Sequence, residues 1–506
     1  MTRVKPAGDG LSAADSRAVL AADLRQRRQA AASALAIPKR AAEGPAVLSF
    51  SQQRMWFLDQ WEPGAPTSNG CRAIRIRGRL DVDALKTAFV TVVERHESLR
   101  TIFVLEAREP RQVVLDEWTL ELPEVDLTAL PLRDRANELA RRIRESSREP
   151  FDLSKDLMIR TTLFRTGDDD TVLLVRLHHI AADAFSDGVL FGEVAKVYDA
   201  VSAGAVPELT ELPIQYADFA SWQHDRLQGK LLEDLVAYWT NELRGAPQLI
   251  PLPTDRPRQP VQRHDGARHE VHLPMELADG VRDLARAEGC TVYMVLLGAF
   301  STLLYRLSGT DDVVVGSPIA NRTTTELTAM VGFFCNTMAL RTRLGGNPSF
   351  REVCGRVRTT ALGAYQHQEL PFERIVEFLN VPRDPAYNPI FQVNFRAQDG
   401  ARLPLRLAGV ETSLVPVDIG FSRFDLALEL HVELECISGY FEVDRDLFDP
   451  ATVAHFADDF AALLKQVVAE PDTPILAVRL PYGRRLATEA APRSPVQRTR
   501  RANSNT

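Results

Sequence analysis

The sequence predicts an α/β fold of two lobes, on three observations. Strand-like apolar runs alternate with amphipathic, helix-like runs along most of the chain. A proline-rich stretch, residues 247–262 (PQLIPLPTDRPRQPVQ), interrupts this alternation near its middle. The chain has 506 residues, which is enough for two large units. We therefore expect an N-terminal lobe at residues 46–245 and a C-terminal lobe at 246–480.

The N-terminal lobe should contain a helix over residues 80–99, where Leu85, Phe89 and Val92 recur at helical spacing and Asp81 or Asp83 can cap the start. TVLLVRL (171–177) is typical of a buried strand, and SDGVLFGEVAKVYDA (186–200) has one apolar helical face. The C-terminal lobe repeats the pattern. It has an apolar helix at 291–309, a strand at 311–320, and a final helix at 449–468 with Pro450 near its first turn.

The two ends differ from this body. Residues 1–45 are rich in Ala and Arg and favour helix, which suggests a linker or a docking segment. Residues 481–506 carry six arginines and almost nothing apolar, so we expect a disordered basic tail.

Composition excludes several classes of protein. Apolar residues make up 45% and charged residues 25%, as in globular proteins, and the net charge of −8 gives no reason to expect nucleic acid. No apolar run reaches membrane-spanning length. Five cysteines, odd in number and never in a CxxC pattern, fit a reducing compartment and argue against structural zinc. We expect a cytoplasmic, monomeric protein.

The stretch LHHIAADAFSDG (177–188) joins the predicted strand to the predicted helix. Adjacent side chains on an extended segment point to opposite faces, so one of His178 and His179 can face a cavity while the other faces inward. A neutral imidazole can accept a proton near pH 7. No Ser or Cys nucleophile stands nearby in a known pattern, so a working His179 would act on a nucleophile that a substrate brings. A purely structural turn is the alternative.

A metal site is a further alternative, and it would need a third ligand. By residue type, the candidates are His264, His269 and His272, but HDGARHEVH (264–272) has the pattern of a loop entering a strand. We therefore expect no metal.

Seven blocks of sequence then point to one family. They are LSFSQQRMWFLDQW (48–61), RHESLRTIF (95–103), HHIAADAFS (178–186), YADFASWQ (216–223), VGFFCNTMALR (331–341), HQELPFERIV (367–376) and RDPAYNPIFQVNF (383–395). In this order they resemble the motifs of condensation domains from nonribosomal peptide synthetases, with HHxxxDG at the histidines.

The resemblance implies two lobes of the chloramphenicol-acetyltransferase type, arranged as a V with a tunnel between them. A donor carrier protein would present an acyl thioester, and an acceptor carrier or a free small molecule would present an amine or a hydroxyl. The enzyme would join the two as an amide or an ester. Both thioesters would hang on phosphopantetheine arms of the partners, so no bound cofactor is implied.

The resemblance also assigns roles at the histidine motif. His179 would be the general base or the group that positions the amine, and His178 would be structural. Asp183 would be a salt-bridged scaffold residue. Its arginine partner is left open, with Arg100, Arg306 and Arg322 as candidates.

Three further positions match residues near the tunnel, namely Ser317 in GSPIANR, Asn388 in RDPAYNP, and Ala184. Ala184 stands where the motif has glycine. If that position needs a positive φ, alanine costs on the order of 1 kcal/mol, and if the glycine lets a pantetheine arm pass, the methyl group narrows the way. Some family members with altered motifs are inactive or do different chemistry.

The predicted function is therefore a condensation enzyme of nonribosomal peptide synthesis. No adenylation signature and no GGxS carrier serine is present, so substrates would come on separate proteins or on other parts of a longer synthetase. Two alternatives stay open. One is an acyltransferase of the same fold that uses acyl-coenzyme A, and the other is a non-catalytic domain that recruits a protein to a loaded carrier.

Overall fold

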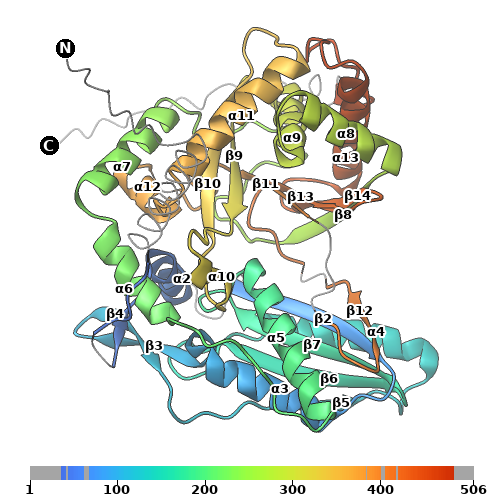
Figure 1. Cartoon of the computed structure of the whole chain (residues 1–506). Helices are drawn as coiled ribbons and strands as arrows, with labels where there is room; N and C mark the ends of the chain where they lie inside the picture. Colours follow the sequence, from blue (N-terminus) through green and yellow to red (C-terminus); the bar gives the residue numbers. More distant parts are fainter. Residues whose placement is uncertain are drawn as a thin grey trace, which may run out of the picture.

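The computed structural model describes residues 36–41, 44–61, 68–382, 384–399, 405–417 and 420–483. Most of the predicted N-terminal segment 1–45 and of the predicted basic tail 481–506 lies outside the described residues. The predicted mixed α/β fold with two lobes is confirmed, one lobe lying below the other in the view of Figure 1.

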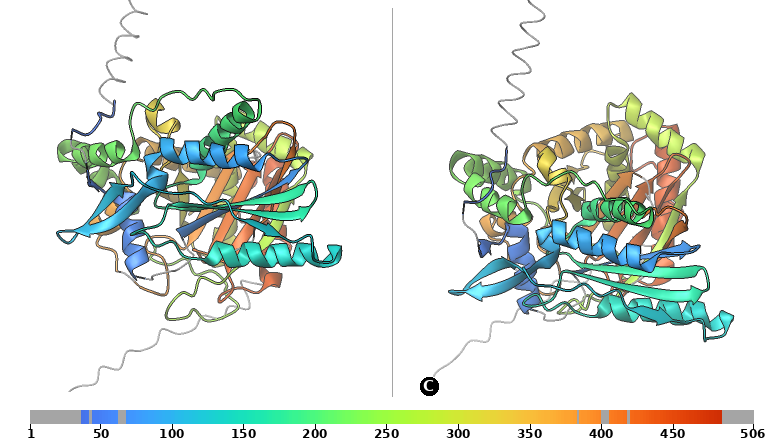
Figure 2. Two further views of the ribbon diagram at one scale, coloured as in Figure 1. Left: turned by 90° about the horizontal axis from the view of Figure 1, so that it is seen from below. Right: turned by 60° about the horizontal axis from the view of Figure 1, so that its bottom comes forward.

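The N-terminal lobe is built on a five-stranded sheet in the order β12-β2-β7-β6-β5. Helices α3 (Val82–Arg95) and α5 (Ala184–Ser202) pack on one face, and α4 (Leu132–Arg148) packs on the other (Figure 2). A small sheet of order β1-β4-β3 lies at one end. The strands are β1 (Ala46–Val47), β2 (Asn69–Arg77), β3 (Thr101–Glu106), β4 (Glu109–Val114), β5 (Glu124–Asp126), β6 (Ile159–Gly167), β7 (Asp170–His178) and β12 (Glu411–Val415).

The C-terminal lobe has a six-stranded sheet in the order β10-β9-β11-β13-β14-β8. Four helices, α8 (Met275–Ala287), α9 (Val292–Ser308), α11 (Phe350–Gln366) and α13 (Pro450–Ala469), cover one face and share its apolar core (Figure 1). The other face looks toward the N-terminal lobe. The strands are β8 (Gly266–Leu273), β9 (Asp312–Ile319), β10 (Asn336–Arg343), β11 (Val393–Asp399), β13 (Leu426–Val432) and β14 (Ile437–Asp444).

Local sequence signals explain where several helices begin and end. The Asp81 carboxylate accepts a hydrogen bond from the backbone N–H of Ala84 at 2.9 Å, so Asp81 rather than Asp83 caps α3. Thr291 caps α9 in the same way, and Gly309 ends that helix at a φ of 75°, which glycine adopts without strain. Pro450 is the first residue of α13.

The chain does not cross between the lobes at the proline-rich stretch, whose Ile250 and Leu252 already lie in the core of the C-terminal lobe. After α6 (Tyr216–Arg226), helix α7 (Gly229–Leu243) already buries Leu235 and Trp239 in the core of the C-terminal lobe. Strand β12, from the C-terminal half of the sequence, pairs antiparallel with β2 at the edge of the N-terminal sheet. The two lobes are therefore interlocked.

In the part of the chain that the structure describes, no single helix has the length and apolarity to cross a membrane. Helices α8 and α9 pass such a test only together, with a bend of 105° between them.

Candidate active site

The predicted histidine turn connects the end of β7 to the start of α5. Backbone hydrogen bonds anchor it on both sides: the N–H of His178 donates to Met158, and that of His179 donates to the Ser68 carbonyl at 2.8 Å. The N–H of Ala181 donates back to the His178 carbonyl and closes the turn. The two imidazoles therefore project from a fixed backbone.

His178 points inward. It is 3% exposed, its Nδ1 accepts a hydrogen bond from the backbone N–H of Ile180 at 3.1 Å, and its ring meets the Phe151 ring edge-on at 5.8 Å. Because Nδ1 accepts, the proton of the neutral ring is on Nε2. Burial, with the positive charge of Arg423 adding to it, lowers the pKa of His178 to about 3. These contacts are those of a structural residue.

His179 is partly exposed. Its Nδ1 lies 3.2 Å from the carbonyl oxygen of Ala182, which can only accept, so Nδ1 carries the proton and Nε2 keeps its lone pair. Among the described residues Nε2 has no hydrogen-bond partner. Burial lowers the pKa of His179 to about 3, the Arg423 charge acts in the same direction, and the bond to Ala182 opposes them. The imidazole is therefore neutral at pH 7.

Asp183 sits in a dense hydrogen-bond network. It caps α5, where Oδ1 accepts from the N–H and the hydroxyl of Ser186 at 2.9 and 2.8 Å, and Oδ2 accepts from the N–H groups of Phe334 and Cys335. Arg322 completes the set with an ion pair at 3.0 Å, and both side chains are at most 3% exposed. A carboxylate whose lone pairs are used in this way holds structure and has none left for proton transfer.

Of the three arginine candidates, Arg322 is thus the one that pairs with Asp183. Arg100 donates to the Leu115 carbonyl at 2.7 Å, beside β3. Arg306 donates to carbonyl groups of Ile475 and Val478 in the C-terminal lobe, at 2.9 and 2.8 Å. Neither lies in the Asp183 network.

Ala184 is the first residue of α5, its side chain is exposed, and its φ is not positive. The condition under which alanine would be strained is therefore not met, and the first helical position suits alanine.

The other two predicted tunnel residues are engaged in hydrogen bonds. The Ser317 hydroxyl accepts from Tyr293 at 2.6 Å and donates to the Phe395 carbonyl at 2.8 Å. Ser317 is 1% exposed, so the structure places it inside the C-terminal lobe rather than on a passage. Asn388 donates from Nδ2 to the Arg423 carbonyl at 2.7 Å and so holds the segment that carries Arg423 toward the histidines.

Sequence reasoning missed three contributors to this site. Ser186 joins Asp183 to the backbone of Gly332, because its hydroxyl donates to the carboxylate and accepts from the Gly332 N–H. Arg72, on β2, pairs with Asp187 in the first turn of α5 at 2.6 Å. Only the spacing of Ser186, three residues after Asp183, could have indicated a capping box in the sequence. The charge pair joins residues more than a hundred positions apart, so no local pattern indicates it.

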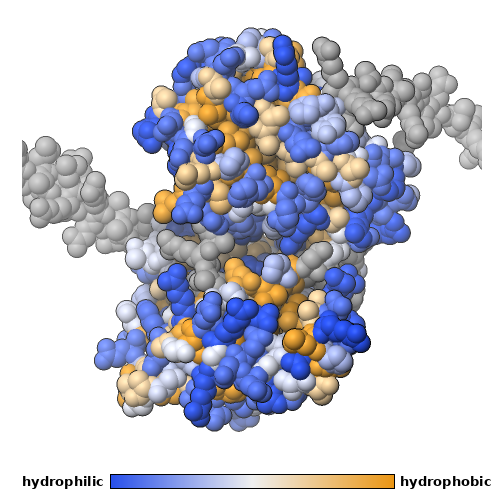
Figure 3. Space-filling model, turned by 90° about the vertical axis from the view of Figure 1, so that its right-hand side faces the viewer, coloured by the Kyte–Doolittle hydropathy of each residue, from blue (hydrophilic) through white to orange (hydrophobic). Residues whose placement is uncertain are grey.

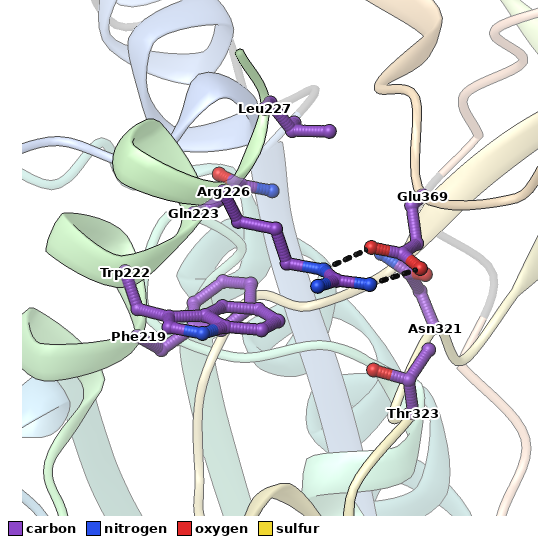
Figure 4. A pocket seen from close by; sticks show the side chains of 8 residues that line it. All are labelled: Phe219, Trp222, Gln223, Arg226, Leu227, Asn321, Thr323 and Glu369. Atoms are coloured by element: carbon purple, nitrogen blue, oxygen red, sulfur yellow. Dashed lines mark hydrogen bonds and ion pairs between the residues drawn. The ribbon is translucent and has the colours of Figure 1, made fainter. Parts of the chain in front are cut away.

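A separate small pocket lies between α6 and the segment after β9 (Figure 4). Arg226 reaches across it to Glu369, with hydrogen bonds at 2.5 and 3.0 Å, and Trp222 lies beneath the guanidinium. His179 is not among its lining residues. In the described part of the chain, no three His, Cys, Asp or Glu side chains gather as metal ligands would.

Each lobe has a large sheet backed by helices, strand β12 interlocks the two lobes, and the histidine turn lies where they meet. This architecture defines a two-lobed protein of the chloramphenicol-acetyltransferase type. The chain belongs to the condensation domain family, whose model matches residues 42–483. The predicted membership is therefore confirmed.

Similar curated proteins are large peptide synthetases. The chain is 43% identical over 437 residues to one of the linear gramicidin synthase proteins of Brevibacillus parabrevis, covering 86% of this chain and 6% of that protein. It is 40% identical over 451 residues to phosphinothricin tripeptide synthetase PhsC of Streptomyces viridochromogenes, covering 88% of this chain and 41% of that protein. The chain therefore spans less than half the length of these relatives.

Solved structures of condensation-type domains share the fold. The X-domain from teicoplanin biosynthesis, in its complex with OxyB, superposes with a TM-score of 0.79 at 29% identity, covering 88% of this chain and 98% of that one. The first condensation domain of the calcium-dependent antibiotic synthetase, in complex with a substrate analogue, superposes with a TM-score of 0.74 at 19% identity, covering 86% and 99%.

Proposed function

We propose that the chain forms an amide bond, or in the same way an ester bond, between an acyl thioester on a donor carrier protein and an amine or hydroxyl acceptor. The observation that carries this proposal is the state of His179, which is neutral, anchored through Nδ1, and partly exposed with a free lone pair on Nε2. No side-chain nucleophile is needed, because the acceptor brings its own.

The proposed step is a direct transfer. The acceptor nitrogen attacks the thioester carbonyl, the new C–N bond forms as the C–S bond breaks, and the departing thiolate leaves as a thiol that has gained the proton the amine loses. A base with a pKa of about 3 removes an ammonium proton poorly, since efficient proton transfer needs a pKa near the working pH. The low value therefore supports a role in which Nε2 accepts a hydrogen bond from the amine and orients its attack.

The test uses carrier proteins loaded with acyl groups, one as donor and one as acceptor, with products read by intact-protein mass spectrometry. We expect His179→Ala to slow transfer of the acyl mass by about a hundredfold, because the amine loses the group that orients it. His272→Ala, which changes an exposed histidine on β8, is the matched control and should transfer at the unmutated rate. Equal rates for the two variants would refute the role of His179.

A second candidate function has one observation in its favour. The X-domain from teicoplanin biosynthesis, which is 29% identical, was solved in complex with OxyB, and this likeness supports the alternative of a domain that recruits another protein. Loaded carriers that bind without any transfer of mass would favour this candidate. Transfer from an acyl-coenzyme A thioester with no carrier present would instead favour the acyl-coenzyme A alternative.

A further inference from the structure

Two ion pairs face each other across the junction of the lobes, close to His179. On the N-terminal side Arg72 pairs with Asp187 at 2.6 Å, and on the C-terminal side Arg396 pairs with Glu429 at 3.5 Å. We call these four residues the charged wall. No role predicted from the sequence uses them.

The N-terminal half of the wall is placed beside His179 by the pleat of β2. A Cβ built on Gly70 would lie 3.9 Å from Cε1 of His179, so that face of β2 looks at the imidazole. Arg72 is two residues further along the same face, which is about 7 Å along the strand. Its partner Asp187 stands one helical turn after Asp183, on the helix that begins at the histidine turn.

The C-terminal half lies on the sheet face that the helices leave uncovered. Arg396 and Glu429 are direct neighbours in the register of β11 and β13, and Tyr440 on β14 donates its hydroxyl to Glu429 at 2.8 Å. The alternate residues of these strands, such as Phe395 and Leu428, are buried under the helices. Arg396 and Glu429 therefore lie on the other face of the sheet. That face of the sheet looks toward the N-terminal lobe (Figure 1).

The two halves act on each other electrostatically. Asp187 is the largest cause of the raised pKa of Arg72, and Glu429 contributes to it from the other lobe. Burial raises the pKa of Asp187, and both Arg72 and Arg396 oppose that rise. The surface is hollowed where the lobes meet (Figure 3), and all four side chains keep some exposure, so a ligand can reach them.

In each ion pair of the charged wall, the arginine side chain is more exposed than its carboxylate partner. The Arg72 side chain is 38% exposed against 14% for Asp187, and Arg396 is 29% exposed against 19% for Glu429. Arg72 also donates to the Cys71 carbonyl and Arg396 to the Gln398 side chain, but a guanidinium has five N–H donors, so each keeps donors for a ligand. An aliphatic group placed against this surface would strip water from charged groups without replacing the lost hydrogen bonds, whereas a carboxylate would replace them.

We propose that the acyl group held at His179 carries an acidic side chain, which Arg72 and Arg396 bind from the two lobes. This inference rests on the proposed function and names its class of substrate. A phosphopantetheine arm also carries an anion, but its phosphate is at the end remote from the thioester, whereas Arg72 is close to the imidazole.

The test measures binding and needs no turnover. The probes are pantetheine amides, stable analogues of the thioester, of glutaric acid, of its neutral monoamide, and of pentanoic acid, with dissociation constants taken by titration calorimetry. We expect the glutaryl probe to bind about tenfold more tightly than either neutral probe. Arg72→Gln and Arg396→Gln should each remove most of this preference. Arg75→Gln is the matched control, because Arg75 pairs with Asp170 on the opposite face of β2, and it should keep the preference.

Three outcomes would overturn the inference: equal or tighter binding of a neutral probe, no measurable binding of any probe, or an equal loss in the Arg75 variant. A second set of probes that also carry the phosphate of the arm distinguishes the two anions that could bind, the acyl carboxylate and the phosphate. If the phosphate tightens the binding of all three probes equally, and this gain depends on Arg72 and Arg396, then the charged wall binds the phosphopantetheine arm and the inference fails. Selective glutaryl binding without transfer between loaded carriers would refute the proposed function alone, and transfer without glutaryl preference would refute this inference alone.

Discussion

Asp183 and Asp187 stand one turn apart at the start of α5, and each pairs with an arginine, but the two pairs differ in their surroundings. The Asp183–Arg322 pair is at most 3% exposed and is saturated with hydrogen bonds. The Asp187–Arg72 pair is partly exposed at the junction of the lobes. The type of residue therefore does not decide whether an ion pair builds the scaffold or meets the substrate. Burial and the number of competing hydrogen bonds decide it.

The largest expected effect is the loss of the buried pair. Arg322→Leu leaves the Asp183 carboxylate buried without its counter-charge, which should lower the free energy of unfolding by about 3–5 kcal/mol. Arg72→Leu, at the partly exposed pair, should lower it by about 1 kcal/mol. Urea unfolding followed by circular dichroism measures both values. Similar losses for the two variants would remove the distinction drawn between the pairs.

A smaller effect is expected for the hydroxyl that braces the buried pair. Ser186→Ala removes a buried hydroxyl that donates to the Asp183 carboxylate and accepts from the Gly332 N–H, and should cost about 1–3 kcal/mol of unfolding free energy. Ser221→Ala removes a helix-internal hydroxyl bond to the Ala217 carbonyl and should change stability by less than about 0.5 kcal/mol. If the Ser186 variant is as stable as the Ser221 variant, the network is not what holds the turn.

Lowering the pH should lower the free energy of unfolding through the two histidines of the turn. The pKa of His178 is about 3 in the folded protein and about 6.5 in an unfolded chain, so between these values the unfolded chain binds more protons and stability falls as the pH falls. The slope is at most about 1.4 kcal/mol per pH unit for each such histidine. Unfolding in urea at pH 6.5 and at pH 4.5 should show a smaller loss for His178→Gln than for the unmutated protein. An identical loss in both would mean that His178 takes up its proton without unfolding.

The smallest effect is expected at Ala184. Because this residue is exposed at the first position of α5 and its φ is not positive, Ala184→Gly should lower stability by less than about 1 kcal/mol and should leave the transfer rate between carriers unchanged. Thermal unfolding and the mass-spectrometric assay measure the two quantities. A large gain in rate would show that the methyl group obstructs a substrate.

Much of the fold and part of the site could be predicted from the sequence. The alternation of apolar runs indicated the lobes, and the ordered motifs indicated the family and His179. The partner of Asp183 could not be chosen, because all three arginines are distant in sequence and only the folded path of residues 320–332 brings Arg322 under α5. The charged wall was missed for a similar reason. Alternating polar residues such as Glu429 and His431 mark one exposed strand face, but the pattern is the same whether that face meets bulk water or the other lobe.

Strand β12 adds a consequence for engineering. It completes the edge of a sheet whose other strands come from the first half of the chain, next to β2. A chimaera that joins the first half of this domain to the second half of a relative must therefore also match a foreign strand against the backbone of β2. Swapping whole domains avoids that mismatch, whereas a graft made at the proline-rich stretch would leave the β2 edge to pair with a strand it did not evolve beside.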